Sequence, residues 1–257
     1  MKIENKIIGL ILGVILIAPN SLLSREWIGS PKRNNANQIA ARSSNCAPAT
    51  QNRVLEFNNA SAYIENSGLL WYNRSLGRAS YIIPKDAGTS PIYAGGLWMG
   101  GVDPTGQLKL AAIRFRNQGN DYWPGPLTVD HSYKLKNNQK PYGNAETSQE
   151  ECSKWDKFYV ISRKEVALHR AWIANPSDYP DYTIPKSIKE WPAHGNSNQD
   201  RYIAPFFDSD NDGTYDPEKG DYPHYHFEED EEYNCRSTRD IRLFGDKTIW
   251  WIFNDKG

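Results

Sequence analysis

The chain has 257 residues, of which 39% are hydrophobic and 12% are aromatic, and its formal net charge is −1. This composition is typical of a folded protein with a sizeable core and excludes an intrinsically disordered chain. A net charge near zero offers no basic footprint for nucleic acid, so we expect no nucleic-acid partner.

The first residues predict export. Lys2 and Lys6 flank Glu4, and an almost unbroken apolar run follows over residues 7–18. Such a run is too short for a comfortable membrane span and is typical of a secretory signal peptide. We therefore predict a signal peptide over residues 1–24, with a retained anchor as the alternative. Ala18 and Ser24 are both small enough for the cleavage point. The mature chain is expected to be secreted or held at the cell surface, with no membrane span.

Residues 25–53 are predicted to form a flexible leader, because they are mostly polar and rich in Asn, Ser and Ala. Three cysteines, Cys46, Cys152 and Cys235, fit an oxidising compartment without making a disulfide framework. One bridge and one remaining thiol are compatible with this number, and all three pairings stay open. No CxxC motif occurs, so we expect no zinc site built on cysteine.

From Val54 onward, turns recur at short intervals and predict strands. The predicted strands are residues 54–64, 69–72, 79–83, 92–102, 107–116 and 249–253. A turn at 66–68 separates the first two, and Asp103-Pro104-Thr105-Gly106 joins a hairpin. The glycines at 95, 96, 100 and 101 indicate bulges or close packing beneath another layer. The chain ends in turn residues where a partner strand is expected, which predicts a domain truncated at its carboxyl end.

One helix is predicted by a capping box. Ser162 and Glu165 have the required spacing, apolar residues follow, and Asn175-Pro176 ends the pattern. A shorter copy of the pattern covers residues 187–190. The predicted fold is mainly β: an antiparallel β-sandwich-like domain over residues 54–257, with one or two short helices and a calcium-binding loop.

The calcium prediction comes from residues 208–216, which read Asp-Ser-Asp-Asn-Asp-Gly-Thr-Tyr-Asp. Carboxylates at alternate positions can converge on one point when Gly213 supplies a sharp turn, and hard oxygen ligands suit Ca²⁺. The predicted ligands are Asp208, Asp210, Asp212, Thr214 through its carbonyl, and Asp216, with Glu218 or Asp221 completing the shell. The alternative is a solvated acidic turn, because Asp, Asn and Gly all favour turns.

This loop departs from a full EF-hand. Counting from Asp208, the twelfth position is Lys219, where a bidentate Glu is expected. Pro205, Pro217 and Pro223 exclude a regulated helix pair around the loop. We therefore predict a rigid structural site of the extracellular kind, with a Kd of roughly 10⁻⁴–10⁻³ M.

Other candidate sites are weaker. Trp98, Tyr122 and Trp123 are the first candidates for an aromatic platform that stacks on sugars, although aromatics in a β fold more often fill the core. His224 and His226 have a spacing that can bind zinc or copper, and the alternative is a solvated acidic loop.

Catalytic motifs do not stand out. The chain contains no Gly-x-Ser-x-Gly, no His-Glu-x-x-His and no Gly-rich phosphate loop. His194 is more readily interpreted as a satisfied structural histidine than as a catalytic base, because no partner is evident. No catalytic residue is predicted.

Several motifs together resemble a known family. They are residues 92–101, 106–108, 111–112, 119–126, 191–195, 208–216, 220–223 and 250–257. In these the chain resembles the amino-terminal region of large bacterial cell-surface proteins exported by type IX secretion, and the acidic loop is similar to thrombospondin type 3 and EF-hand calcium loops. The resemblance covers roughly residues 54–257. It implies a multi-domain extracellular protein with a carboxy-terminal sorting domain, which this sequence lacks. Residues 224–246 also look longer and more charged than the family pattern.

These observations predict a secreted bacterial surface module with a structural calcium loop, acting in adhesion or binding and not as an enzyme. Surface glycans, other cell-surface proteins and the export machinery are the expected partners. The alternative is that the chain is the amino-terminal carbohydrate-binding or targeting part of a larger extracellular hydrolase.

Overall fold

The computed structural model describes residues 46–102, 106, 108–115, 121–129, 146–228 and 241–255. These residues all belong to a unit that covers residues 41–257. The predicted signal peptide and most of the predicted leader lie outside the described residues. Cys235, the hairpin residues 103–105, motif residues 119–120, the acidic run 229–232 and the last two turn residues also lie outside them.

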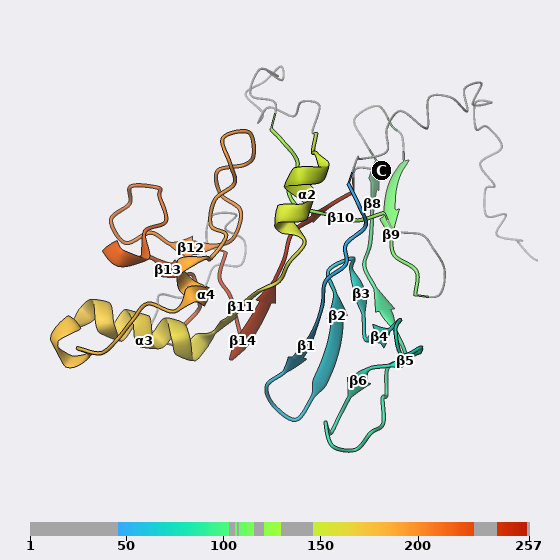
Figure 1. The fold of residues 1–257 in the computed structure, drawn as a ribbon, viewed down its shortest axis with the longest axis horizontal. Helices are drawn as coiled ribbons and strands as arrows, with labels where there is room; N and C mark the ends of the chain where they lie inside the picture. The colour runs from blue at the N-terminus through green and yellow to red at the C-terminus, as the bar shows by residue number, and fades with distance from the viewer. Residues whose placement is uncertain are drawn as a thin grey trace, which may run out of the picture. The chain divides into compact units, whose positions relative to one another are not determined.

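The largest sheet is built from the first part of the unit. Its strands follow the order β1-β2-β3-β7, and β6 also pairs with β2. They are β1 (Asn52–Glu56), β2 (Ser61–Glu65), β3 (Leu69–Leu70), β6 (Tyr81–Ile82) and β7 (Gly95–Gly96). Figure 1 shows β1, β2 and β3 running side by side. The single strand predicted over residues 54–64 is wrong, because Asn58 accepts a hydrogen bond from the Ala60 N–H and turns the chain into a β1–β2 hairpin.

The remaining strands form antiparallel two-stranded ribbons. They are β4 (Tyr72–Asn73) with β5 (Arg78–Ala79), β8 (Trp98–Val102) with β9 (Leu108–Ala112), β10 (Trp123–Pro124) with β15 (Phe253–Asn254), β11 (Tyr159–Ser162) with β14 (Lys247–Trp250), and β12 (Phe206–Phe207) with β13 (Tyr222–Pro223). The β8–β9 hairpin is confirmed, with Val102 opposite Leu108. The strand predicted over 249–253 is divided between β14 and β15, which have different partners.

Short helices connect and cover these strands. They are α2 (Gln149–Trp155), α3 (Arg163–Ala174), α4 (Lys186–Lys189), and the 3₁₀ turns η2 (Pro176–Asp178) and η3 (Pro217–Lys219). The predicted capping box is confirmed, since Ser162 accepts from the Glu165 N–H and Glu165 accepts from the Ser162 N–H. The mainly β fold with few short helices is likewise confirmed.

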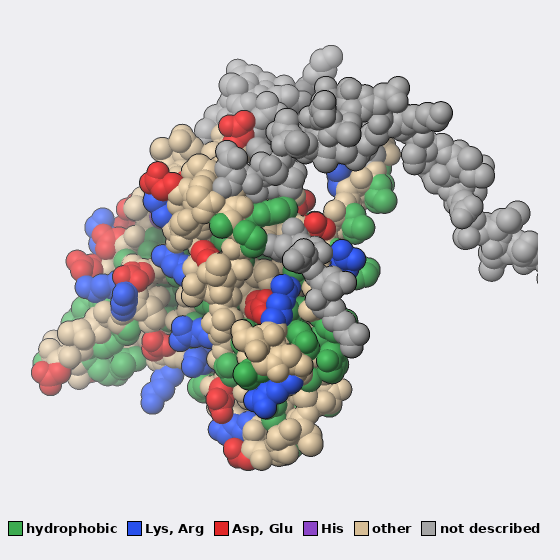
Figure 2. Space-filling model, turned by 45° about the vertical axis from the view of Figure 1, so that its right-hand side comes forward, with side chains coloured by type: hydrophobic (Ala, Val, Ile, Leu, Met, Phe, Trp, Pro, Cys, Tyr) green, Lys and Arg blue, Asp and Glu red, His purple; other side chains and the backbone are tan. Residues whose placement is uncertain are grey.

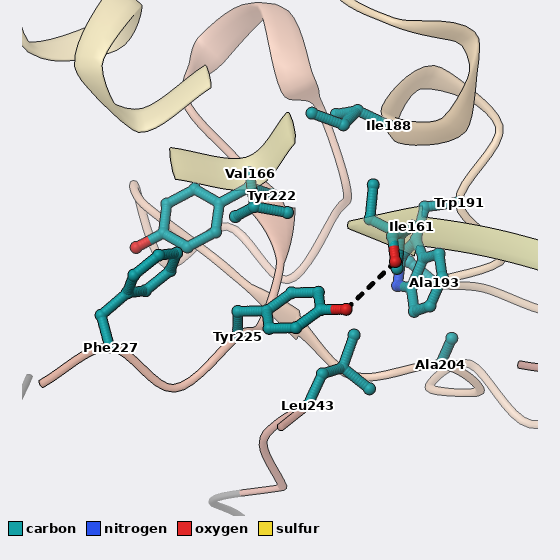
Figure 3. Close-up of a cluster of buried hydrophobic side chains, with 10 residues drawn as sticks. All are labelled: Ile161, Val166, Ile188, Trp191, Ala193, Ala204, Tyr222, Tyr225, Phe227 and Leu243. Atoms are coloured by element: carbon teal, nitrogen blue, oxygen red, sulfur yellow. Dashed lines mark hydrogen bonds between the residues drawn. The ribbon is translucent and has the colours of Figure 1, made fainter. Parts of the chain in front are cut away.

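The main core surrounds Tyr225, which is fully buried (Figure 3). Its hydroxyl donates to the Ile161 carbonyl at 3.1 Å, so this buried polar tip has a partner. Side chains of β11, α3, α4, β13, the 191–204 segment and positions 227 and 243 pack around it: Ile161, Val166, Ile188, Trp191, Ala193, Ala204, Tyr222, Phe227 and Leu243. Burying a large apolar side chain contributes about 1.5–3 kcal/mol. This core therefore holds together segments that are far apart in the sequence.

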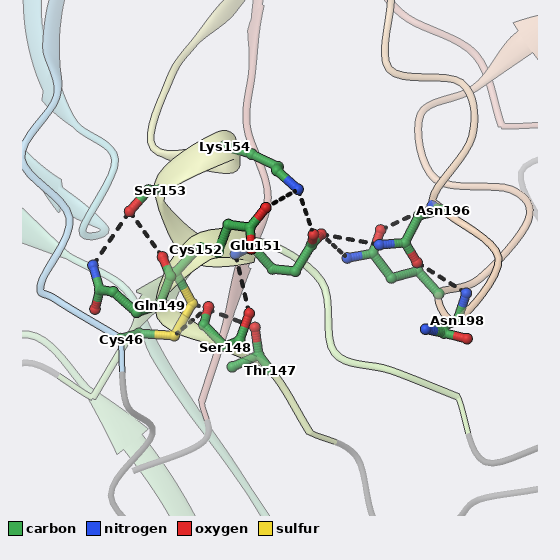
Figure 4. A network of polar contacts seen from close by, with 12 residues as sticks. Cys46, Thr147, Ser148, Gln149, Glu151, Cys152, Ser153, Lys154, Asn196 and Asn198 are labelled. Carbon is green, nitrogen blue, oxygen red and sulfur yellow. Dashed lines mark hydrogen bonds and ion pairs between the residues drawn. A yellow bond between two sulfur atoms is a disulfide. The ribbon is translucent and has the colours of Figure 1, made fainter.

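A disulfide joins the end of the predicted leader to α2. Cys46 and Cys152 are bonded, with Cα atoms 5.8 Å apart (Figure 4). Thr50 adds a hydroxyl and an N–H bond to Asp156 at the end of the same helix. Residues 46–53 thus belong to the folded part, and the bridge is one of the three pairings that the sequence left open.

The carboxylate of Glu151 links α2 to the 194–201 segment. It accepts hydrogen bonds from Lys154 on its own helix and from Asn196 and Gln199 of the 194–201 segment (Figure 4). Gly195 is required in that segment, since a Cβ there would lie 2.6 Å from the Asp200 carbonyl oxygen. The tight loop brings His194 and Arg201 together, with the His194 Nδ1 2.6 Å from the Arg201 carbonyl oxygen.

Candidate metal centre

The acidic loop connects two short paired strands. β12 and β13 are antiparallel with Phe207 opposite Tyr222, so residues 208–221 leave and return at the same place. The two rings stack with centroids 4.8 Å apart and planes 12° from parallel. The strand pair therefore closes the loop at its base.

Three of the predicted ligands converge within this loop. Asp208, Asp210 and Asp212 each offer a carboxylate oxygen, and these oxygens all lie within 4.8 Å of one another. No other group of three or more His, Cys, Asp or Glu side chains converges in this way in the described ranges. At this separation each pair of charges repels by about 1 kcal/mol even at the dielectric constant of water. The cluster therefore favours a cation at its centre.

Backbone donors hold the three carboxylates in place. Asp208 Oδ2 accepts the Gly213 N–H at 2.8 Å. Asp210 accepts the Asp212 N–H at 3.2 Å, and Asp212 accepts the Thr214 N–H at 2.6 Å. Each carboxylate thus uses one oxygen to shape the loop, and these bonds leave its second oxygen for another partner.

The second oxygen of Asp208 is the most informative atom of the loop. Asp208 Oδ1 is buried and accepts no hydrogen bond. Leaving a buried acceptor unsatisfied costs about 1–3 kcal/mol, and more when the group is charged. Hard carboxylate oxygens in such a position suit Ca²⁺, which takes six to eight oxygen ligands. The donor set therefore fits a divalent cation.

The sharp turn of the loop needs its glycine. Asn211 and Gly213 both adopt positive φ, at 59° and 74°. A Cβ at Gly213 would also lie 2.9 Å from the Tyr202 hydroxyl oxygen. The predicted role of Gly213 as the turning residue is confirmed by both its backbone conformation and this close approach.

The other predicted ligands have different partners. Asp216 caps η3 by accepting the Glu218 N–H and pairs with Lys219 at 3.4 Å. Glu218 lies 3.6 Å from Lys189. Thr214 donates its N–H to Asp212, and its role as a ligand through the carbonyl stays a prediction. Asp216, Glu218 and Asp221 are not part of the convergent group of three.

Asp221 supports the loop from the inside. Its side chain is only 1% exposed, and its two oxygens accept the Ser209 N–H at 2.8 Å and the Asp216 N–H at 2.7 Å. Burial raises the pKa of this carboxyl group above its usual value, against the opposing effect of the two N–H donors. Asp221 therefore joins the two arms of the loop.

Lys219 experiences the negative field of the loop. Its hydrogen bond and charge interaction with Asp216, together with the charges of Asp212 and Asp210, raise the pKa of this exposed ammonium group. Lys219 holds the position where an EF-hand carries its bidentate Glu, and here it pairs with Asp216 instead of supplying a ligand.

Two residues of the 194–201 segment brace the loop, and sequence analysis did not assign them this role. Arg201 donates to the Gly213 carbonyl at 2.8 Å. His194 Nε2 accepts the Tyr215 N–H at 2.8 Å, so Nδ1 carries the proton donated to the Arg201 carbonyl. Both nitrogens of His194 are engaged with backbone groups, which is the arrangement of a structural histidine.

His169 on α3 anchors the far end of the loop. It is fully buried, its Nε2 lies 3.2 Å from the Asp221 carbonyl oxygen, and its Nδ1 lies 3.0 Å from the Tyr182 hydroxyl. A neutral imidazole that donates to Asp221 and accepts from Tyr182 satisfies both contacts. Burial lowers the pKa of His169 below its usual value, against the opposing effect of the Asp221 carbonyl.

This lowered pKa predicts acid sensitivity. The unfolded chain takes up a proton at His169 below pH ~6.5, and the folded chain resists it until the pH falls through its lower pKa. The stabilising contribution is therefore complete above pH ~6.5 and is lost as the pH falls below that value. We expect the free energy of unfolding to fall by up to ~1.4 kcal/mol per pH unit there. His169→Gln should remove that slope in urea titrations between pH 7.5 and 5, and an unchanged slope would contradict this role.

The three aromatic candidates do not form one platform. Tyr122 is fully buried and donates its hydroxyl to the Ala111 carbonyl, so it has no face to offer a sugar. Trp123 is half-buried in β10, where it pairs with Asn254. Trp98 alone is well exposed, at 68%, and its indole N–H donates to the Ile113 carbonyl. Tyr122 is therefore a core residue.

The two candidate imidazoles, His224 and His226, have other neighbours. His224 packs edge-on against Phe207, and His226 Nδ1 lies 3.2 Å from the Arg242 guanidinium. Neither belongs to a convergent group of metal ligands within the described part of the chain. On the face drawn in Figure 2, acidic and basic side chains are interspersed.

No protein family model, curated protein or solved structure matches the chain. The resemblance to surface proteins exported by type IX secretion therefore stays a prediction. Among the helices that the structure describes, none has the length and apolar character needed to cross a membrane.

Proposed function

We propose that this chain is a secreted surface-binding module in which the 208–216 loop holds one Ca²⁺ ion as a structural element. The observation that carries the proposal is the Asp208 Oδ1 atom, buried without a hydrogen-bond partner beside the carboxylates of Asp210 and Asp212. A bound cation would satisfy this oxygen and offset the repulsion among the three charges.

The residues divide into ligands and supports. Asp208, Asp210 and Asp212 would bind the ion directly, and Asp221 would hold the loop from behind through the Ser209 and Asp216 N–H groups. Asp216 would act as the cap of η3. Water would complete the shell, because Ca²⁺ accepts water among its oxygen ligands.

Two further observations support an extracellular binding role. The Cys46–Cys152 disulfide is of a kind that persists in oxidising compartments. His194, the histidine closest to a catalytic candidate in the sequence, has both nitrogens engaged with backbone groups. A binding surface ordered by calcium therefore accounts for these residues better than catalysis does.

The expected stabilisation by calcium is modest. With a Kd of about 0.1 mM and about 1 mM calcium, binding to the folded state adds ~1.4 kcal/mol to the free energy of unfolding. Calcium should order the loop while the cores around Tyr225 and Tyr122 hold the fold.

The test is a calcium titration of the double variant Asp210→Asn/Asp212→Asn. We expect the wild type to gain ~1.4 kcal/mol in 1 mM calcium and the variant to gain none, because two of the three charged ligands are lost. Thermal unfolding followed by circular dichroism, with and without EDTA, measures the difference.

The matched control is Asp178→Asn/Asp181→Asn. It removes two negative charges from exposed positions outside the loop and should keep the full calcium response. A calcium response in the loop variant equal to that of the wild type would overturn the metal centre. A response lost equally in both variants would reduce the effect to net charge and would also overturn it.

A further inference from the structure

An open cleft lies directly beside the candidate metal centre. Its volume is about 840 Å³, and its lining includes Asp208, the first residue of the acidic loop. Sites for small ligands commonly have volumes of ≈ 300–1,000 Å³ and combine apolar walls with a few polar groups. The cleft is therefore of suitable size for a ligand and shares a residue with the cation loop.

Aromatic side chains form the walls of this cleft. Tyr202 is 57% exposed, and its ring stacks on Phe206 with centroids 6.2 Å apart and planes 23° from parallel. Trp250 of β14 also lines the cleft and is fixed by ring contacts with Tyr159 and Trp191. Tyr202 thus presents an accessible, supported aromatic face.

Polar groups lie beside these rings. Asp200 lines the cleft, and its Oδ1 atom accepts the Tyr202 N–H at 3.2 Å, which fixes the carboxylate next to the ring. The Arg201 guanidinium carbon lies 5.7 Å from the centre of the Tyr202 ring. His224 contributes an imidazole to the lining. The cleft therefore combines apolar ring faces with acceptors and donors for hydrogen bonds.

The charge balance decides the class of ligand. Two carboxylates beside aromatic rings, taken alone, suit a cationic amine. In the proposed function, however, the cation offsets the charge of Asp208, and the Arg201 guanidinium adds a positive charge 5.7 Å from the centre of the Tyr202 ring. A nearly neutral, amphipathic cleft fits a ligand that has apolar faces and many hydroxyl groups.

We propose that this cleft binds a neutral oligosaccharide, with one sugar ring stacked on Tyr202 and a hydroxyl donating to Asp200. The inference rests on the proposed function, because it assigns the ligand class of that binding module. Tyr202 also connects cleft and loop, since its hydroxyl lies against Gly213 and Arg201 bonds the Gly213 carbonyl. Calcium that orders the loop therefore steadies the ring, and calcium removal is expected to weaken sugar binding.

The test is a screen of the purified chain against an array of neutral, acidic and amine-bearing glycans in 1 mM calcium, followed by calorimetry with the best neutral binder. We expect Tyr202→Ala to weaken binding about tenfold through the lost stacking. Tyr202→Trp should retain binding, because it keeps an aromatic face. Tyr93→Ala is the matched control, as Tyr93 is 51% exposed and does not line the cleft.

The cleft assignment would be overturned if no neutral glycan bound, if Tyr202→Ala bound as tightly as the wild type, or if Trp98→Ala abolished binding while Tyr202→Ala left it unchanged. Selective capture of amine-bearing glycans alone would also overturn it.

Failure of the metal centre is recognised separately. If the calcium titration of Asp210→Asn/Asp212→Asn matched that of the wild type, the proposed metal centre would be refuted, whatever the glycan array showed. If this variant lost its calcium response and no glycan on the array bound the wild type, the metal centre would stand and the sugar-binding proposal would be refuted.

Discussion

Removal of the Cys46–Cys152 disulfide by the double substitution Cys46→Ala/Cys152→Ala is expected to lower the free energy of unfolding by about 3–5 kcal/mol. The bridge spans 106 positions, and closing a loop of this length removes much of the conformational freedom of the unfolded chain. Urea unfolding followed by tryptophan fluorescence measures the loss.

The folded state should tolerate this change. Thr50 and Ala47 keep their hydrogen bonds to Asp156 and Gln149, so the 46–53 segment stays attached to α2 without the bridge. The cost therefore arises mainly in the unfolded ensemble, and the circular dichroism spectrum of the folded variant should match that of the wild type.

Cys235→Ala is the control for this experiment. It has no part in the Cys46–Cys152 bond and should leave the urea midpoint unchanged under non-reducing conditions. An equal midpoint for the wild type and the double variant would contradict the stabilising role of the bridge. Peptide mapping that found Cys235 bonded to Cys46 or Cys152 would contradict the pairing itself.

Local signals in the sequence predicted several elements correctly. The Ser162–Glu165 capping box begins α3, and β8 and β9 pair as the predicted hairpin requires. The close packing expected at the glycines is present at two of the four, since a Cβ would lie 2.7 Å from the Trp71 ring at Gly95 and 2.9 Å from the Ile113 carbonyl oxygen at Gly96. It is wrong for Gly101, where a Cβ would meet no described atom within 4 Å. Each of these features depends on residues adjacent in the chain or on the absence of a side chain.

Two local signals were available and were not used. Ser148 caps α2 by accepting the Glu151 N–H, which is the same Ser-x-x-Glu spacing that identified α3. Asn58 turns the chain between β1 and β2, and Asn is a strong turn residue. The β-forming residues on both sides of this turn concealed it.

Other features depend on contacts between distant residues. The apolar run at 249–253 contributes to two ribbons, one with β11 and one with β10. Both partners lie far earlier in the chain, so the sequence around the run does not show where it is divided. Trp71 follows β3 with a positive φ of 66°, and neither a tryptophan nor its neighbours in the sequence predict this conformation. Spacing alone likewise does not separate a carboxylate that binds an ion from one, such as Asp216, that caps a helix.

The replacement of Asp221 by Ala is expected to lower the free energy of unfolding by about 3 kcal/mol and the calcium affinity by at least about tenfold. Both oxygens of this buried carboxylate accept backbone N–H groups, and hydrogen bonds to charged groups contribute about 1.5–3 kcal/mol each. Residues that orient metal ligands from behind typically change metal affinity by 10–100-fold.

The substitution Asp221→Asn separates hydrogen bonding from charge. It removes the same negative charge as Asp221→Ala and keeps one acceptor, so one of the Ser209 and Asp216 N–H groups loses its partner. We expect a smaller loss of about 1–2 kcal/mol. Repulsion from Asp208 and Asp210 also raises the pKa of Asp221. If that repulsion outweighed the two hydrogen bonds, both variants would be more stable than the wild type in EDTA, and urea unfolding would show it. Stability falling from wild type to Asn to Ala, with calcium affinity falling in parallel, would establish Asp221 as the support that holds the three ligands in place.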